Sequence, residues 1–314
     1  MLTRFILAAL LASLISPSQA AEPLRVANQK SGIKLLLQAA GELKDVPYPI
    51  EFSEFPAAAP LGEALNAGAV DVGGLGDAPY VFALGSGAPL KVVAVTEADG
   101  RFSTSILVPK DSPLHTVADL KGKRIVTNRG SVGHFLVIRA LREAGLQTSD
   151  VQLINLLPSD ARTALEAGSA DAWSTWDPYT TIAITQNGAR ILRNSDNLLS
   201  NQGYLAATQQ AIDTKQTQLD DFIKRMDRAY QWANSHPQQY AAAQAKVTGL
   251  PLAVHLASAS NTRFTRIPIT PSIVSNLQQT ADIYLQEGVL TRPVDVSKGF
   301  DDRFNPPTLT GVNP

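Results

Sequence analysis

The segment of residues 129–134 brings together groups that can bind an anion. Arg129 carries a positive charge, Gly130 lets the backbone approach closely, and Ser131 and His134 add a hydroxyl and an imidazole. The segment follows a predicted strand and opens a predicted helix, whose first N–H groups and dipole favour negative charge. Neutral His134 can donate one hydrogen bond to an anion, and its protonation below about pH 6.5 is expected to tighten binding.

A comparable helix start lies about a hundred residues earlier. Gln29, Ser31 and Gly32 follow a short predicted strand and precede an apolar-rich helix, with Ser31 as the expected N-cap. Two such helix starts that face each other could hold one anion between them. Neither segment is a Walker phosphate loop, because no Gly-Lys-Ser/Thr follows the glycines.

Aromatic side chains near the predicted strand ends could contact an organic group. Trp176 stands beside Asp177-Pro178 at the end of a predicted strand, and its large apolar face could pack a ligand's hydrocarbon part. The alternative is that Trp176 belongs to the core of the protein, as expected for the more interior Trp173. Phe55, Pro56 and Tyr204 are further candidates for contact with the organic tail.

Two aspartates, Asp77 and Asp177, occupy matching places in the chain. They could form a catalytic carboxylate pair, but each precedes a helix-initiating Pro or Ala-Pro, which favours a role as helix N-cap. The backbone amides near Gly76 and Asp77 are expected to help hold an anionic headgroup. The four histidines have no metal-ligand spacing, and no nucleophile elbow or zinc-protease motif occurs. No catalytic residue, metal site or cofactor is therefore predicted.

These candidates are positioned by a unit that occurs twice. Several separated segments share an offset of about a hundred residues, although chance similarity of Ala/Gly-rich turns is an alternative explanation. The paired segments are 25–31 with 125–131, 66–71 with 166–171, and 73–80 with 173–179. Two similar α/β lobes would face each other across a cleft lined by loops at corresponding strand ends.

The order of predicted elements gives the arrangement within each lobe. Strands and helices alternate, which predicts a mostly parallel sheet flanked by helices. From residue 218 onward the pattern changes to successive helices, which are expected to add bulk to the first lobe. The predicted division is a signal peptide at 1–20, a discontinuous first lobe at 21–102 and 206–314, and a second lobe at 103–205.

The N-terminus and the composition limit the compartment and the partners. Arg4, an apolar run at 5–15 and Ala20 at the expected cleavage point are typical of an export signal. Cysteine is absent, which excludes disulfides, thiolate metal sites and lipid attachment at a cysteine. The net charge of −1 and the lack of basic runs argue against nucleic-acid or membrane-surface partners. We expect a periplasmic protein.

Four segments resemble a known family, the periplasmic binding proteins of aliphatic-sulfonate uptake, within the wider nitrate, taurine and sulfonate-binding group. They are Gly-Asp-Ala-Pro at 76–79, Val-Ala-Asp-Leu-Lys-Gly-Lys at 117–123, the helix at 138–146, and Asp-Ala-Trp-Ser-Thr-Trp-Asp-Pro-Tyr at 171–179. The last segment is the most specific of the four. The likeness extends over nearly the whole mature chain.

The resemblance implies a two-lobed periplasmic-binding-protein fold of type II that closes over a small organic anion. It implies a monomer, not an enzyme, that hands an aliphatic sulfonate to the membrane permease of an ABC importer. Taurine, an aromatic sulfonate, a sulfate ester or nitrate is the alternative ligand. An enzyme is the other class, since remote relatives make a pyrimidine precursor.

Overall fold

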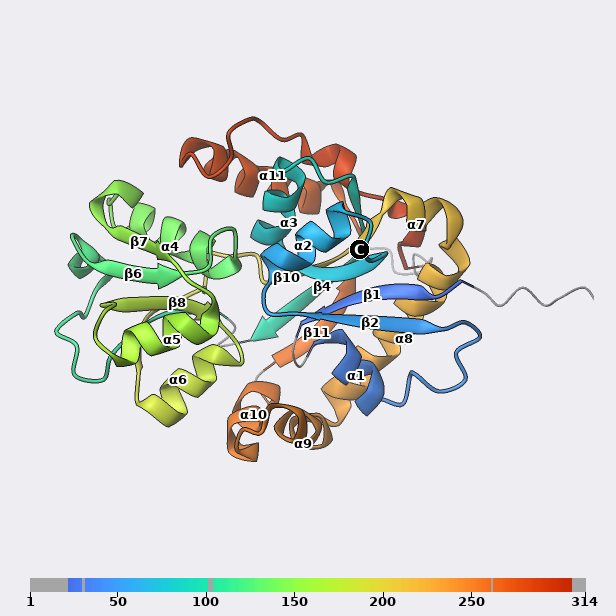
Figure 1. The fold of residues 1–314 in the computed structure, drawn as a ribbon, viewed down its shortest axis with the longest axis horizontal. Helices are drawn as coiled ribbons and strands as arrows, with labels where there is room; N and C mark the ends of the chain where they lie inside the picture. Colours follow the sequence, from blue (N-terminus) through green and yellow to red (C-terminus); the bar gives the residue numbers. More distant parts are fainter. Residues whose placement is uncertain (1–21, 30–31, 101–103, 261, 307–314) are drawn as a thin grey trace, which may run out of the picture.

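The computed structural model describes residues 22–29, 32–100, 104–260 and 262–306. The predicted signal peptide and Ser31 lie outside these ranges. Within them, the strands form a six-stranded and a five-stranded sheet, and helices pack on both faces of each (Figure 1). The predicted α/β class with two sheets is confirmed.

The larger sheet contains strands from both the beginning and the last third of the chain. In spatial order its strands are β11 (Thr262–Ile267), β4 (Leu90–Gly100), β10 (Gln202–Thr208), β3 (Val72–Gly76), β1 (Leu24–Gln29) and β2 (Ile50–Phe55). The smaller sheet is built from the middle of the chain. Its strands, in order, are β7 (Gln152–Asn155), β6 (Arg124–Thr127), β8 (Ala172–Trp176), β5 (Thr104–Val108) and β9 (Arg190–Asn194).

Both sheets are mixed. Three neighbouring strands are parallel in each, β2-β1-β3 and β7-β6-β8, whereas β10 and β5 pair antiparallel beside β3 and β8. The prediction of a mostly parallel sheet therefore holds only for these triplets. The chain passes from the larger to the smaller sheet between β4 and β5, and it returns between β9 and β10. β5 and β10 are thus the first strands after each crossing. The predicted boundary at 205/206 falls inside β10, so the chain crosses before Gln202.

Helices connect the strands, and in the last third of the chain, which was expected to be helical throughout, they are interrupted by β11. They are α1 (Ile33–Ala39), α2 (Ala58–Asn66), α3 (Asp77–Gly85), α4 (Val132–Glu143), α5 (Pro158–Glu166), α6 (Tyr179–Asn187), α7 (Gln209–Thr214), α8 (Gln216–Ser235), α9 (Pro237–Thr248), α10 (Leu252–Ala259) and α11 (Pro271–Gln286). Short 3₁₀ turns occur at Val117–Leu120, Thr148–Asp150, Val296–Gly299 and Asp302–Phe304. Side-chain caps fix several starts: Ser131 accepts from His134 N in α4, and Thr270 accepts from Ile273 N in α11.

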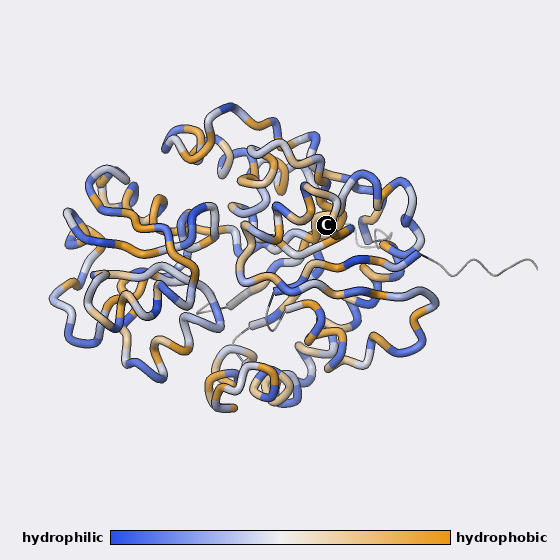
Figure 2. Tube along the Cα trace, viewed as in Figure 1, coloured by the Kyte–Doolittle hydropathy of each residue, from blue (hydrophilic) through white to orange (hydrophobic). Residues whose placement is uncertain are grey.

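Each sheet has one hydrophobic cluster on each face. Helices α2, α3 and α11 pack on one face of the larger sheet, and α1, α8 and α9 pack on the other. In the smaller sheet, α4 covers one face, and α5 and α6 cover the other. Figure 2 shows the apolar residues concentrated where strands and helices meet. No helix in the described ranges has the length and apolar character needed to cross a membrane.

Helix α4 also joins the two halves of the molecule. Phe135 and Ile138 belong to the same cluster as α3 and α11 of the larger sheet. Phe135 meets the ring of Tyr284 edge-on at 5.2 Å between centroids, and the Tyr284 hydroxyl donates to Ser131 O at 3.3 Å. The two sheets are therefore connected by an apolar interface as well as by the chain.

The structure confirms the repeat and corrects its register. The backbone N–H of Arg25 donates to Asp71, and that of Arg124 donates to Asp171. Arg25 thus corresponds to Arg124, an offset of 99, whereas the sequence comparison paired Arg25 with Ile125. The two aspartates themselves keep the offset of 100.

The two equivalent aspartates differ in burial. Asp71 also binds the ammonium of Lys215 at 2.8 Å, and both side chains are at most 9% exposed. Burial alone would raise the pKa of Asp71, but hydrogen bonds from Arg25 and Lys215 hold that pKa below its ordinary value. In the second copy, Asp171 and Arg124 form a pair whose side chains are 30% and 39% exposed.

We predict that Asp71→Ala lowers the free energy of unfolding by about 3–5 kcal/mol, because it leaves Lys215 charged and buried. Asp171→Ala should cost about 1 kcal/mol or less, since water can replace the exposed pair. Because the folded pKa of Asp71 is depressed, the loss at neutral pH should shrink as the pH falls below about 4. Urea unfolding at neutral and acid pH measures the loss of unfolding free energy in Asp71→Ala and in Asp171→Ala. Equal losses at neutral pH would contradict the prediction.

Candidate ligand-binding cavity

A cavity of about 540 Å³ lies between the two sheets and is lined by residues of both. The volume is within the range of small-molecule sites. From the larger sheet and its helices come Gln29, Gly32, Pro56, Asp77, Tyr240, Gln244, Thr248, His255 and Ser258, and from the smaller sheet come Thr104, Val132, Trp176, Asp177, Pro178, Tyr179 and Thr181. Leu199, Asn201, Gln202 and Gly203, at the second crossing of the chain, also line it.

Four helices begin at the cavity wall. Gly32 precedes α1, Asp77 begins α3, Val132 begins α4 and Tyr179 begins α6, and all four residues line the cavity. These are the helices that follow β1, β3, β6 and β8, which occupy equivalent positions in the two sheets. The first N–H groups of a helix have no partner within it, and the dipole is positive there. This ring of four helix starts includes the two helix starts from which the sequence predicts an anion site.

Most of the segment 129–134 faces protein rather than the cavity. The Gly130 N–H donates to His134 Nδ1, and the Ser131 hydroxyl caps α4. A Cβ on Gly130 would lie 2.8 Å from the Phe82 ring, and its φ is +75°, so this glycine permits a left-handed turn against Phe82. Arg129, Gly130, Ser131 and His134 are not among the described residues that line the cavity.

Two expectations for this segment are corrected. Burial, reinforced by the charge of Arg129, lowers the pKa of His134 to about 4. His134 therefore stays neutral above about pH 5 and does not supply the predicted pH term. Arg129 is exposed, and its backbone N–H donates to Asn155 Oδ1.

The aromatic candidates divide into cavity wall and core. Trp176 is half-buried and lines the cavity together with Pro56, whereas Trp173 is 1% exposed and belongs to the core of the smaller sheet. Tyr204 lies in the core, 2% exposed and stacked on Tyr80, because β10 runs through the middle of its sheet. Phe55 packs against the same core cluster. Tyr204 and Phe55 are not among the described residues that line the cavity.

Gly76 is likewise placed by packing. It stands just before α3, and a Cβ there would lie 2.6 Å from Cγ1 of Val132. The first turns of α3 and α4 approach closely because this position has no side chain. Gly76 does not itself line the described cavity.

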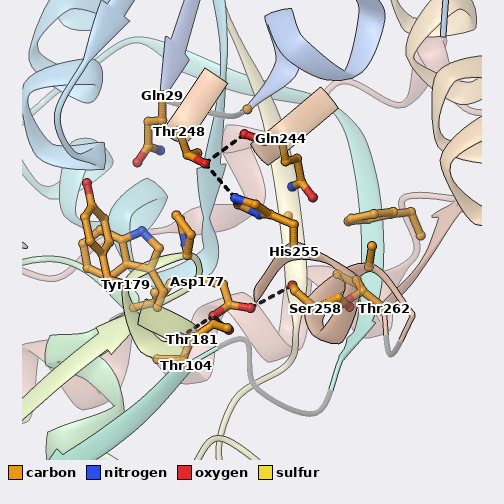
Figure 3. A pocket seen from close by; sticks show the side chains of 18 of the residues that line it. Gln29, Thr104, Asp177, Tyr179, Thr181, Gln244, Thr248, His255, Ser258 and Thr262 are labelled. Atoms are coloured by element: carbon orange, nitrogen blue, oxygen red, sulfur yellow. Dashed lines mark hydrogen bonds between the residues drawn. The ribbon is translucent and has the colours of Figure 1, made fainter. Parts of the chain in front are cut away.

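The two aspartates at the cavity receive hydrogen bonds on both oxygens. Asp177 Oδ1 accepts from the N–H and hydroxyl of Thr181 in the first turn of α6, and Oδ2 accepts from the Ser258 hydroxyl at 2.9 Å (Figure 3). Asp177 therefore accepts a hydrogen bond from the first turn of α6, but Pro178 occupies the N-cap position that was predicted for Asp177. Asp77 is not an N-cap, because Gly76 occupies that position; Asp77 Oδ1 accepts from Ala78 N, and Oδ2 accepts from Ser200.

Burial raises the pKa of both carboxyls. For Asp77 the hydrogen bonds from Ala78 and Ser200 oppose this shift, and for Asp177 those from Thr181 and Ser258 do. Each carboxylate is engaged by its own first turn and by one distant hydroxyl. This arrangement does not match a pair of carboxylates sharing a catalytic proton.

Sequence reasoning missed the polar residues of α9 and α10. Tyr240, Gln244 and Thr248 recur every four residues along α9 and so lie on one face, and His255 and Ser258 lie one turn apart on α10. These helices were expected to supply only bulk. The four-residue spacing of polar side chains was the available signal. Among the described residues, no cluster of three or more His, Asp or Glu could hold a metal ion.

The comparisons with known proteins agree with this architecture. The profile of the NMT1/THI5-like family matches residues 55–240. An aliphatic sulfonates-binding protein of Escherichia coli (strain K12) is 35% identical over 286 residues, which is 90% of this chain and 89% of the relative. The crystal structure of the alkanesulfonate-binding protein SsuA from Xanthomonas axonopodis pv. citri bound to MOPS superposes with a TM-score of 0.84 at 31% identity, covering 90% of this chain and 99% of that one.

An enzyme shares the fold at greater distance. The desulfurization enzyme DSZB superposes with a TM-score of 0.61 at 16% identity, covering 90% of this chain and 97% of that chain. This likeness concerns the fold alone.

The two tryptophans should respond differently to truncation. We predict that Trp173→Ala lowers the free energy of unfolding by about 3–5 kcal/mol, the cost of a cavity in a packed core. Trp176→Ala should cost about 1 kcal/mol, because the indole already borders a cavity. Urea denaturation of both variants, with the m-values compared, measures the difference. A larger loss for Trp176→Ala would place that side chain in the core.

Proposed function

Because the chain belongs to the NMT1/THI5-like family, we propose that it is the solute-binding component of an ABC importer and that it binds aliphatic sulfonates. The relatives named for aliphatic sulfonates and alkanesulfonates cover almost all of the chain and support this ligand class. Taurine, an aromatic sulfonate, a sulfate ester or nitrate is the alternative within the same class of function.

The observation that carries the proposal is the ring of four helix starts at the cavity. A sulfonate has three oxygens that share one negative charge, and it stays ionised at any working pH. Backbone N–H groups at helix starts can donate to several such oxygens without a cationic side chain. The described lining residues include no Lys or Arg, and Trp176 and Pro56 offer apolar surface for a hydrocarbon tail.

We propose export through a signal peptide cut after Ala20, a periplasmic monomer, and delivery of the ligand to a membrane permease. The two lobes would be 21–102 with 206–314, and 103–205, adjusted so that all of β10 belongs to the first.

We propose that the protein is not an enzyme. The hydrogen bonds that engage both oxygens of Asp77 and of Asp177 support this, as do the names of the more similar relatives. Purified protein incubated with 1-butanesulfonate should release no sulfite, whereas catalytic release would assign it to the enzymes of this fold.

We expect 1-butanesulfonate, at about a hundred times its dissociation constant, to add about 2.7 kcal/mol to the free energy of unfolding. 1-Butanol at the same concentration should add almost nothing, because the helix starts bind the charged headgroup. Trp176→Ala should weaken sulfonate binding by about 1–3 kcal/mol through lost apolar contact. Thermal unfolding and titration calorimetry measure these effects. An alcohol that stabilises the protein equally would refute anion binding.

Binding should depend on pH through the carboxyls rather than through His134. We predict constant affinity between about pH 7 and 9, because helix N–H groups do not titrate. Affinity should increase as the pH falls toward the raised pKa of Asp77 and Asp177, since each proton removes a negative charge that faces the anion. Calorimetry across the pH range measures the profile.

Two variants identify the group responsible. Asp177→Asn should remove part of the increase at acid pH, whereas His134→Gln should leave the profile unchanged. If the affinity no longer increased at acid pH in His134→Gln alone, the imidazole would be the group responsible.

A further inference from the structure

The cavity has a polar wall that the headgroup site does not explain. Tyr240, Gln244 and Thr248 on α9 and His255 and Ser258 on α10 form this α9–α10 wall, and all five line the cavity. Figure 3 shows Gln244, Thr248 and His255 close together, with Asp177 joined to Ser258. A ligand held at the helix starts through its anionic end would direct its other end toward such a wall.

The hydrogen bonds of Thr248 fix the tautomer of His255. The Thr248 hydroxyl donates its single proton to Gln244 O at 2.9 Å, and its oxygen lies 2.7 Å from His255 Nε2. His255 must therefore donate through Nε2–H. Burial lowers the pKa of His255, which keeps the ring neutral. Nδ1 then carries a lone pair and can only accept a hydrogen bond.

Gln244 adds a second acceptor. Its Oε1 is buried and has no hydrogen-bond partner among the described residues. A buried acceptor without a partner costs free energy, and one at a cavity wall can recover it from a ligand or water. Gln244 Oε1 and His255 Nδ1 thus give the wall an accepting character.

We propose that the α9–α10 wall selects sulfonates whose tail ends in a hydrogen-bond donor, either a hydroxyl or an ammonium. A methyl end would leave Gln244 Oε1 without a partner, and a carbonyl or carboxylate end would meet acceptors. This inference rests on the proposed function and names the substrate class of the same cavity.

The test compares sulfonates that differ only at the far end. Alkanesulfonates with tails of three to six carbons are titrated beside their ω-hydroxy and ω-amino counterparts by calorimetry. We expect at least one donor-ended ligand to bind about tenfold more tightly than its methyl-ended match, the worth of one good hydrogen bond. A gain for only one of the two donors identifies the group that the wall accepts and supports the proposal.

A variant assigns the gain to the wall. Gln244→Leu keeps the length of the side chain but removes Oε1, and it should abolish most of the tenfold gain while changing methyl-ended binding by less than about twofold. Gln239→Leu is the matched control, because Gln239 lies exposed on the same helix. It should leave every affinity unchanged. Unchanged methyl-ended binding also shows that the variant is folded.

Two outcomes separate the proposals. If no sulfonate binds the natural protein, the proposed function is wrong and the inference falls with it. If methyl-ended sulfonates bind but no donor-ended ligand binds more tightly, the donor selection is wrong while the function stands. Equal weakening of all ligands by Gln244→Leu would also overturn donor selection.

Discussion

The site depends on one constraint, the direction in which parallel strands lead into helices. β1 runs parallel to β3 and β6 runs parallel to β8, so both strands of each pair leave their sheet at the same edge and the helices that follow begin there. In both copies this edge borders the cavity. Four helix N-termini are brought together in this way by backbone geometry, without any side chain that carries a positive charge among the described lining residues.

The packing of α4 holds the two edges in register. Its Phe135 and Ile138 share a core with α3 and α11, and Gly76 lets Val132 approach the start of α3. The helix starts of α3 and α4 are therefore fixed relative to each other by close packing rather than by the ligand. Ser258 of α10 donates one hydrogen bond to Asp177, just before α6, and no hydrophobic cluster of the described residues is shared by these two helices. A single hydrogen bond contributes far less than a shared core.

Much of the fold could be predicted from sequence because local patterns specify it. The two-sheet α/β arrangement and the repeat expected from the alternating pattern are present, whereas β11 lies in a stretch that was expected to be helical. The errors arise where contacts distant in sequence decide. The glycine at 130 suggested access for an anion, but Phe82 fills that space, and His134 is buried by α11. The offset between the two copies is 99 residues at Arg124 and 100 residues at Asp171. Pairing short segments at one constant offset therefore matched Arg25 with the wrong residue.

The site was only half predicted for the same physical reason. Residues at strand ends, such as Gln29, Asp77 and Trp176, could be placed because the topology brings strand ends together. The α9–α10 wall comes from helices about seventy residues further along the chain than Trp176, and only their packing against α1 and α6 brings them to the cavity. A backbone site repeated in both copies can recognise an anion in general. On the proposed function, discrimination among sulfonates therefore belongs to the helices that lie outside the repeat.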